Sequence, residues 1–154
     1  MLDMARYVPA LLNHLSNKLS HGASVLYRER YGIGITEWRI LAQLASEPGS
    51  TARSICERTA LDKAAVSRSF GFLQERGFVD FLDGSGRRER GATLTPSGRR
   101  LHARIAKVAL ERERRFLAPL TTTEQHTLVD LLHKLYANVD AVNERPAGSA
   151  KSFD

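Results

Sequence analysis

Residues 51–76 read TARSICERTALDKAAVSRSFGFLQER, and their pattern is the most diagnostic of the fold in the whole chain. A short helix is expected over 51–58, a tight turn at 59–61 and a second helix over 62–76. The carboxylate of Asp62 can accept hydrogen bonds from the free backbone N–H groups of a helix start. Two helices at this spacing, joined by so short a turn, predict a helix-turn-helix.

The second helix is expected to have one apolar and one outward face. Its core-facing positions are Val66, Ser69 or Phe70, and Leu73, before Gly77 ends the helix as a C-cap. Its outward positions are Lys63, Ala64, Ser67, Arg68 and Gly71. Small residues let a helix lie deep in the major groove, where Arg68 can reach guanine O6 and N7 while Ser67 and Lys63 hold bases or phosphates. For this helix alone, an ordinary solvated face is the alternative.

Residues 83–95, DGSGRRERGATLT, place three arginines beside three glycines. The flanking runs 78–82 and 91–94 indicate two strands, and an arginine-bearing hairpin directly after a helix-turn-helix is the pattern of a winged helix. Guanidinium groups are attracted to phosphates and into narrow minor grooves. The predicted DNA-binding residues are therefore Thr51, Lys63, Ala64, Ser67, Arg68, Arg87, Arg88 and Arg90. The alternative is a solvated turn in which Glu89 pairs locally.

Long amphipathic helices are expected at both ends of the chain. Over 8–31 the apolar positions step by four and three residues, and the last helix repeats this pattern after a capping box of Thr121 and Glu124. Such spacing suits helices that pack lengthwise on partners. Helices 8–31 and 96–143 therefore predict a homodimer, with a monomeric bundle as the alternative, and the tail 144–154 is expected to be disordered.

Two further helix starts are indicated. Residues 32–35 end the first helix, and Thr36 is expected to be the N-cap of the next one, which stops at 47–50. The apolar side of that helix is expected to be Trp38, Leu41, Leu44 and Ala45. Thr95 and Pro96 supply an N-cap and a first-turn proline for the helix that follows the hairpin.

These elements predict one mainly α domain over 1–154, in which a winged helix-turn-helix lobe of three short helices and a two-stranded wing, 36–95, is flanked by long dimerisation helices. The net charge is +6 and the isoelectric point about 9.9. Residues 84–115 alone carry ten Lys or Arg and three Glu, a balance of +7. A polyanionic partner for this segment is expected.

Three stretches resemble the MarR family of winged-helix regulators in order and spacing: ITEWRILAQLA (35–45), LDKAAVSRSFGFLQERGFV (61–79) and RRERGATLTPSGRRL (87–101). The similarity covers roughly residues 5–143. It implies an obligate dimer, formed by the first and last two helices, that binds pseudo-palindromic double-stranded DNA. It also implies a small effector, often an aromatic or phenolic acid, which loosens DNA binding from a pocket between the dimer region and the DNA-binding lobe.

The wing departs from the family pattern. Family wings usually carry Asp-x-Arg, with the aspartate orienting the arginine. Here Arg88 fits the arginine position, whereas Gly86 stands where the aspartate is expected. Asp83 is the candidate substitute, and without it the DNA contact would depend more on Arg87 and Arg90.

Other kinds of site have little support. Cys56 is the only cysteine, which excludes an internal disulfide, and we interpret it as a small hydrophobe rather than a redox sensor. Two histidine pairs lie seven residues apart, but no acidic cluster completes a metal site. Trp38 and Tyr27, with His14 or Arg39 nearby, are interpreted as core residues, and lining an aromatic ligand pocket is the alternative. Neither a metal nor a cofactor is expected.

No apolar run is long enough to cross a bilayer and no signal peptide is recognisable, so a soluble, cytoplasmic protein is expected. The sequence contains no nucleophile elbow, phosphate-binding loop or HExxH motif, so we do not expect an enzyme. The prediction is a dimeric, ligand-responsive transcriptional regulator, in this family most often a repressor. The alternatives are an architectural DNA-binding protein with little sequence preference and a winged-helix module that docks a protein.

Overall fold

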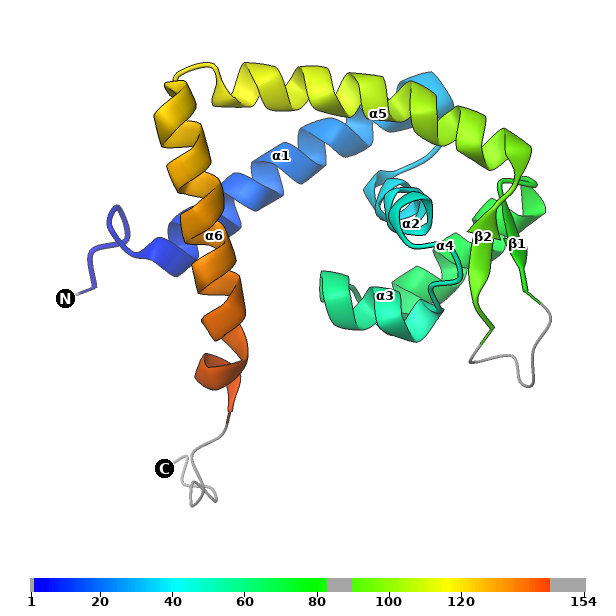
Figure 1. The fold of residues 1–154 in the computed structure, drawn as a ribbon, viewed down its shortest axis with the longest axis horizontal. Coiled ribbons are helices and arrows are strands. Elements are labelled where there is room, and N and C mark those ends of the chain that lie inside the picture. Colours follow the sequence, from blue (N-terminus) through cyan, green and yellow to red (C-terminus); the bar gives the residue numbers. More distant parts are fainter. Residues whose placement is uncertain (1, 83–89, 145–154) are drawn as a thin grey trace. The chain divides into compact units, whose positions relative to one another are not determined.

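Within residues 2–82 and 90–144, which the computed structural model describes, the chain forms six helices and one antiparallel hairpin (Figure 1). The elements are α1 (Val8–Tyr31), α2 (Ile35–Ser46), α3 (Ala52–Thr59), α4 (Lys63–Glu75), β1 (Val79–Phe81), β2 (Ala92–Leu94), α5 (Pro96–Leu117) and α6 (Thr122–Asn143). The mainly helical class is confirmed. The chain divides into two units, 1–111 and 112–154, and the single domain stays a prediction. Apart from Glu144, the predicted tail lies outside the described residues.

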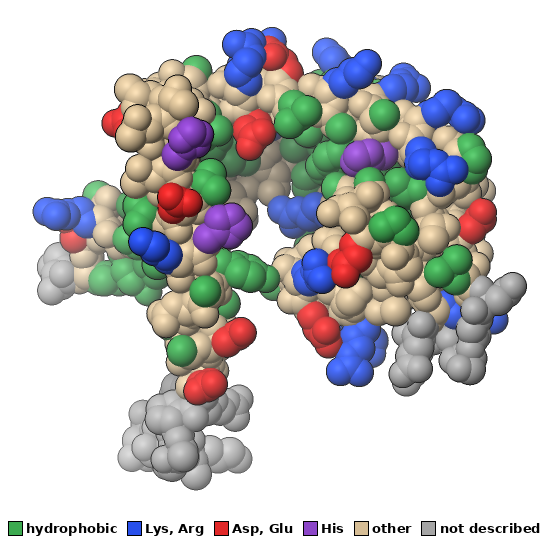
Figure 2. All heavy atoms as spheres, viewed as in Figure 1, with side chains coloured by type: hydrophobic (Ala, Val, Ile, Leu, Met, Phe, Trp, Pro, Cys, Tyr) green, Lys and Arg blue, Asp and Glu red, His purple; other side chains and the backbone are tan. Residues whose placement is uncertain are grey.

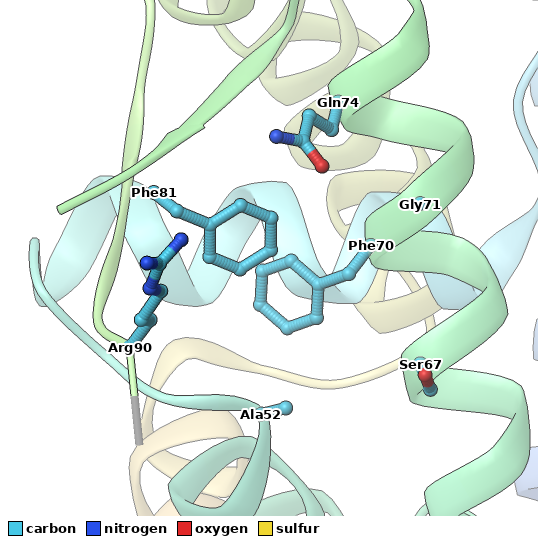
Figure 3. A pocket seen from close by; sticks show the side chains of 7 residues that line it. All are labelled: Ala52, Ser67, Phe70, Gly71, Gln74, Phe81 and Arg90. Carbon is cyan, nitrogen blue, oxygen red and sulfur yellow. The ribbon is translucent and has the colours of Figure 1, made fainter. Parts of the chain in front are cut away.

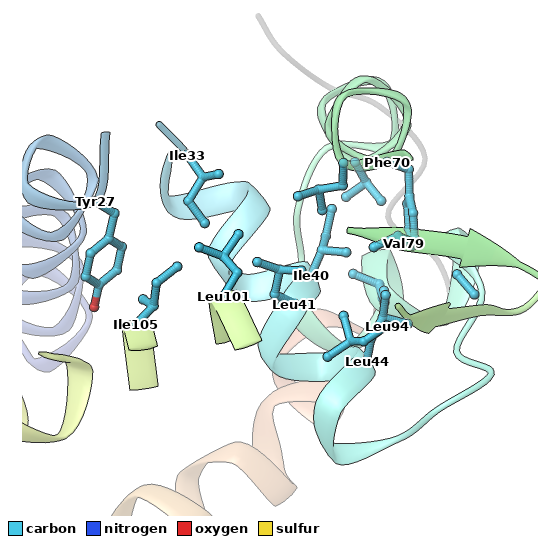
Figure 4. Packing of buried hydrophobic residues seen from close by; sticks show 14 of the residues in the cluster. Tyr27, Ile33, Ile40, Leu41, Leu44, Phe70, Val79, Leu94, Leu101 and Ile105 are labelled. Carbon is cyan, nitrogen blue, oxygen red and sulfur yellow. The ribbon is translucent and has the colours of Figure 1, made fainter. Parts of the chain in front are cut away.

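The core of the first unit is built around α2. On this helix Ile40, Leu41 and Leu44 are fully buried. They lie between side chains of α1 and α5 on one side and side chains of α4 and the hairpin on the other (Figure 4). The α4 residues predicted to face the core, Val66, Ser69, Phe70 and Leu73, are all buried. The helix-turn-helix is therefore anchored on α2, which leaves the opposite side of α4 open to solvent.

The start of α2 differs from the prediction. Gly34, not Thr36, is the N-cap. The reason is a local capping contact that the prediction overlooked: the carboxylate of Glu37, three residues on, accepts a hydrogen bond from the backbone N–H of Gly34 at 2.8 Å. Thr36 consequently lies inside the first turn. Ala45, expected on the apolar side, is exposed.

Polar caps fix both helices of the helix-turn-helix. The hydroxyl of Thr51 accepts from the N–H of Ser54 at 3.1 Å, so α3 begins one residue later than predicted. Asp62 caps α4 as predicted, because its carboxylate accepts from the N–H of Ala65 at 2.8 Å. Between them, Ala60 adopts a left-handed conformation with φ of 50° and turns the chain.

The wing is a short hairpin tied to α3. Strands β1 and β2 pair antiparallel, and each is shorter than the predicted runs 78–82 and 91–94. On its other edge the hairpin bonds with residues 49–51, since the N–H of Gly49 donates to the carbonyl of Ala92 at 2.9 Å and Thr51 forms a bridge with Gly91. The base of the wing is thus fixed next to the start of α3.

Two glycines allow close backbone approaches around the wing. A Cβ on Gly91 would lie 2.5 Å from the carbonyl oxygen of Gly49, and one on Gly98 would lie 1.9 Å from that of Phe78. Gly98 also donates its N–H to the hydroxyl of Thr95 at 3.0 Å, which confirms Thr95 as a cap of α5. The glycines thus let the hairpin pack directly on its neighbours.

The end of α4 differs from the prediction by one residue. The observed C-cap is Arg76, and Gly77, with φ of 67°, follows it, so the predicted C-cap at Gly77 is wrong by one position.

The second unit contains the end of α5 and helix α6. The predicted capping box is confirmed, because the hydroxyl of Thr121 accepts from the N–H of Glu124 and the Glu124 carboxylate accepts from the N–H of Thr121. The pKa of Glu124 is lowered mainly by this backbone hydrogen bond and, to a smaller extent, by a second hydrogen bond from the hydroxyl of Thr121. Among the described residues, no helix combines the length and the apolar character needed to span a bilayer.

Candidate nucleic-acid interface

Helix α4 presents a solvent-facing surface made of four of the predicted DNA-binding residues. All four side chains are exposed: Lys63, Ala64, Ser67 and Arg68. Their spacing along the helix places them together on the side away from the buried Val66 and Leu73. Two cations, a hydroxyl and a methyl group on one exposed helix face suit phosphate oxygens and the base edges of a major groove.

A cleft of about 590 Å³ opens between α4, the start of α3 and the wing. Its lining residues are Ala52, Ser67, Phe70, Gly71, Gln74, Phe81 and Arg90. Figure 3 shows the rings of Phe70 and Phe81 facing each other from α4 and β1, and their centroids are 5.5 Å apart. This ring contact packs β1 against α4 and forms the apolar part of the cleft lining. The polar groups of Ser67, Gln74 and Arg90 lie around it.

The structure adds residues to this surface that the sequence interpretation missed. Gln74 lies seven residues after Ser67 and three after Gly71, so helical spacing alone was a sufficient signal for it. Ala52 and Phe81 gave no comparable signal, because each reaches the cleft only through the packing of α3 and β1 against α4.

The remaining predicted contacts lie on or next to the wing. Arg90 is exposed and directly precedes Gly91, which pairs with Thr51. Thr51 is half-buried and its hydroxyl already accepts the cap hydrogen bond of α3. The backbone pairing therefore sets the distance from Arg90 to the helix-turn-helix. Arg87 and Arg88, together with Gly86 and Glu89, lie outside the described residues.

The basic segment expected at 84–115 is partly visible on α5. Figure 2 shows Lys and Arg side chains along this helix. The exposed ones nearest the wing are Arg99, Arg100, Arg104 and Lys107. Arg99 also donates to the carbonyl of Leu94 at 2.7 Å, which ties the start of α5 to β2.

The aromatic residues considered as a ligand pocket pack against one another. Trp38 meets Tyr27 edge-on at 5.8 Å and stacks on His102 at 5.3 Å between ring centroids. Burial lowers the pKa of His102. Cys56 is half-buried and packs against the core. Across the described ranges, no group of three or more His, Cys, Asp and Glu lies close enough to share a metal ion.

A helix-turn-helix with an exposed polar recognition face, followed by a hairpin fixed beside it, defines the class of winged-helix proteins. The model of the MarR family matches residues 31–89. A solved MarR/EmrR family transcriptional regulator from Acinetobacter sp. ADP1 is 35% identical, with 91% of this chain and 99% of that chain covered and a TM-score of 0.83. The chain belongs to the MarR family of transcriptional regulators.

Two other relatives are more distant. A MarR family protein from Mycobacterium tuberculosis, solved in complex with salicylic acid, is 26% identical over 82% of this chain and 94% of that one, with a TM-score of 0.67. A putative transcriptional regulatory protein for the hcr operon of Thauera aromatica is 28% identical over 98 residues, or 63% of this chain. The match spans only 59% of that curated relative's length.

Proposed function

We propose that this protein is a homodimeric regulator that binds pseudo-palindromic operator DNA without catalysing a reaction. The observation that carries the proposal is the exposed face of α4, where Lys63, Ser67 and Arg68 lie together and Ser67 lines the same cleft as Arg90. In this assignment α4 enters the major groove, and Arg68 reads guanine while Lys63 contacts bases or phosphates. The wing arginines, including Arg87 and Arg88, bind flanking phosphates or a minor groove.

The dimer is supported by two exposed apolar stripes. On α1 the predicted positions Val8, Leu12, Leu15 and Leu19 are 36% to 50% exposed. On α6, where Figure 2 shows hydrophobic side chains at the surface, Leu132, Leu135, Val139 and Val142 are 42% to 72% exposed. Apolar rows of this length are unusual on a monomer. A second copy of the chain is the partner that would cover them.

A small aromatic acid is the proposed effector. The support is the relative from M. tuberculosis that was solved with salicylic acid. Salicylate is therefore the first compound to titrate against the DNA complex, with a non-aromatic acid of the same charge as the control. Weakened DNA binding with salicylate alone is the expected result.

Selection of binding sequences from a random duplex library tests the DNA-binding function. The salt concentration must be fixed near physiological, because phosphate contacts make affinity fall steeply with salt. We expect a pseudo-palindrome whose half-sites are about 34 to 36 Å apart, the spacing of one DNA turn. Recovery of no preferred sequence would point to an architectural DNA-binding protein. Absence of any DNA binding would point to a module that docks a protein.

A further inference from the structure

One turn of α2 contacts three other elements of the first unit. Arg39 donates a hydrogen bond to the hydroxyl of Ser20 on α1 at 3.0 Å. Trp38 stacks on His102 of α5, with the rings 14° from parallel. Glu37 extends in the third direction, towards α4. Residues 37–39 of α2 thus form a junction between α4 and the two helices, α1 and α5, that pack on the opposite side of α2.

The carboxylate of Glu37 uses one oxygen to bond to α4 and the other to bond to the segment between α1 and α2. Its Oε2 accepts from the N–H of Gly34, in the segment between α1 and α2, and its Oε1 accepts from the hydroxyl of Ser69. Ser69 is only 5% exposed. Hydrogen bonds to an ionised acceptor are stronger than neutral ones, and more so when water is excluded. This contact is the polar link between the α1–α2 connection and α4.

Ser69 lies directly after Arg68 on α4. Because successive residues of an α-helix are rotated by about 100°, a contact that fixes Ser69 on the inner face also fixes where Arg68 and Ser67 point on the outer face. A small rotation of α4 would move a guanidinium out of reach of its base. A misplacement of that kind affects sequence choice more than general attraction to phosphates.

We propose that Glu37 is a positioning residue for DNA reading, which acts through Ser69 to set the rotation of α4. The inference rests on the DNA-binding function proposed above. It adds that changes at α1 and α5 reach α4 through the pair Glu37 and Ser69. Trp38 and Arg39 provide the connection on the other side, because they are on the same helical turn as Glu37.

Gly34 offers an independent way to disturb the same link. A Cβ at this position would lie 2.8 Å from Oε2 of Glu37 and 3.1 Å from Nε of Arg28. A methyl group would push the carboxylate aside without removing any polar group. Gly34→Ala is therefore expected to mimic the loss of the Ser69 hydroxyl.

The experiment measures the ratio of affinity for the selected operator to affinity for random duplex of the same length. The parent protein, without substitutions, is tested first, because a ratio near one would reject the DNA-reading function itself before any variant is compared. Glu37→Gln, Ser69→Ala and Gly34→Ala are each expected to lower the ratio about fivefold or more while helix content by circular dichroism is retained. The Glu37→Gln/Ser69→Ala double variant is expected to lose no more than the worse single variant, since both changes remove one link.

Matched controls separate this role from charge and from general stability. Glu29→Gln makes the same charge change at an exposed site on α1, and Ser46→Ala removes an exposed hydroxyl from α2. Both are expected to leave the ratio unchanged. The proposal is overturned if the folded single variants keep the parental ratio, or lose operator and random binding by the same factor. It is overturned equally if the losses of the two single variants multiply in the double variant.

Discussion

Arg68 is an exposed cation on α4, directly after Ser67, which lines the cleft. Replacing it with alanine is expected to weaken operator binding by about 1 to 3 kcal/mol, because a bidentate arginine–guanine contact distinguishes bases. Random duplex should be affected much less. Fluorescence anisotropy with labelled operator and random DNA measures both. Arg30→Ala, at an exposed position on α1, is the charge-matched control. If Arg68→Ala lost the same binding free energy on operator and on random DNA, Arg68 would contact phosphate only and would not read a base.

His102 makes the stability of the protein depend on pH. Burial holds its pKa below the ordinary value of about 6.5 in the folded chain. Between the folded and unfolded pKa values of His102, the unfolded chain binds more protons than the folded chain. The contribution of neutral His102 to stability is therefore fully present above about pH 6.5, and it is lost as the pH falls through the pKa of the folded chain. We expect the urea midpoint of unfolding to be lower in acid than at neutral pH. In His102→Asn this midpoint should depend less on pH. The exposed His126→Asn is the control, and parallel pH profiles for His102→Asn and the parent would contradict the assignment.

The start of helix α4 depends on its N-cap, Asp62. Asp62→Ala removes the acceptor for the N–H of Ala65 and is expected to cost about 1 kcal/mol of unfolding free energy. It should also loosen Lys63, the first residue of the helix. Urea denaturation measures the first effect and DNA titration the second.

Asp62→Asn distinguishes the cap from the charge. The amide oxygen can still accept the hydrogen bond, so stability should stay near that of the parent. Loss of a negative charge beside the DNA-facing residues should increase affinity for all duplexes, and more so at low salt. If Asp62→Asn and Asp62→Ala were equally destabilised, the hydrogen bond to Ala65 would not be what stabilises the helix start.

Sequence patterns predicted the elements better than their exact ends. Helical spacing identified Val66, Phe70 and Leu73 as core residues, since amphipathic periodicity is a local property. The cap at Gly34 was missed, because a glycine has no side chain to mark it and the stabilising acceptor comes from Glu37. Glu37 is only three residues from Gly34, so this local capping contact, and not the hydroxyl of Thr36, sets the start of the helix.

In the candidate site, the local features could be predicted from the sequence and the long-range contacts could not. The outward face of α4 follows from the spacing of its residues, and the predicted exposure of Lys63 and Arg68 is confirmed. The pairing of Thr51 with Gly91 and the hydrogen bond between Glu37 and Ser69 join residues far apart in the chain. No pattern in a single sequence encodes such contacts, because they depend on how α2, α3 and the hairpin pack around α4.

The exposed apolar stripes on α1 and α6 predict that two copies of the chain assemble. Sedimentation at micromolar concentration is expected to give twice the 17.2 kDa chain mass. Leu15→Glu and Leu135→Glu, at positions 46% and 51% exposed, should each shift the protein towards monomer, because a charge in an apolar interface is costly. Both variants should also bind the complete operator more weakly than the parent does, while binding to a duplex with a single half-site should change less.

Leu82→Glu is the matched control for the dimer. Leu82 is also 46% exposed, but it follows β1 at the wing and lies on neither stripe. Its sedimentation should equal that of the parent. A parent protein that sediments at the mass of one chain would reject the dimer outright.

The aromatic cluster around Trp38 gives the protein its own optical reporter. Trp38 is the only tryptophan of the chain, and it contacts Tyr27 of α1 and His102 of α5 while sitting on the same turn of α2 as Glu37. Indole emission responds to the polarity and charge of its immediate neighbours. Any compound that shifts α1 or α5 against α2 therefore alters the intrinsic fluorescence, so a chemical library can be screened for effectors on the unlabelled protein before any operator is known.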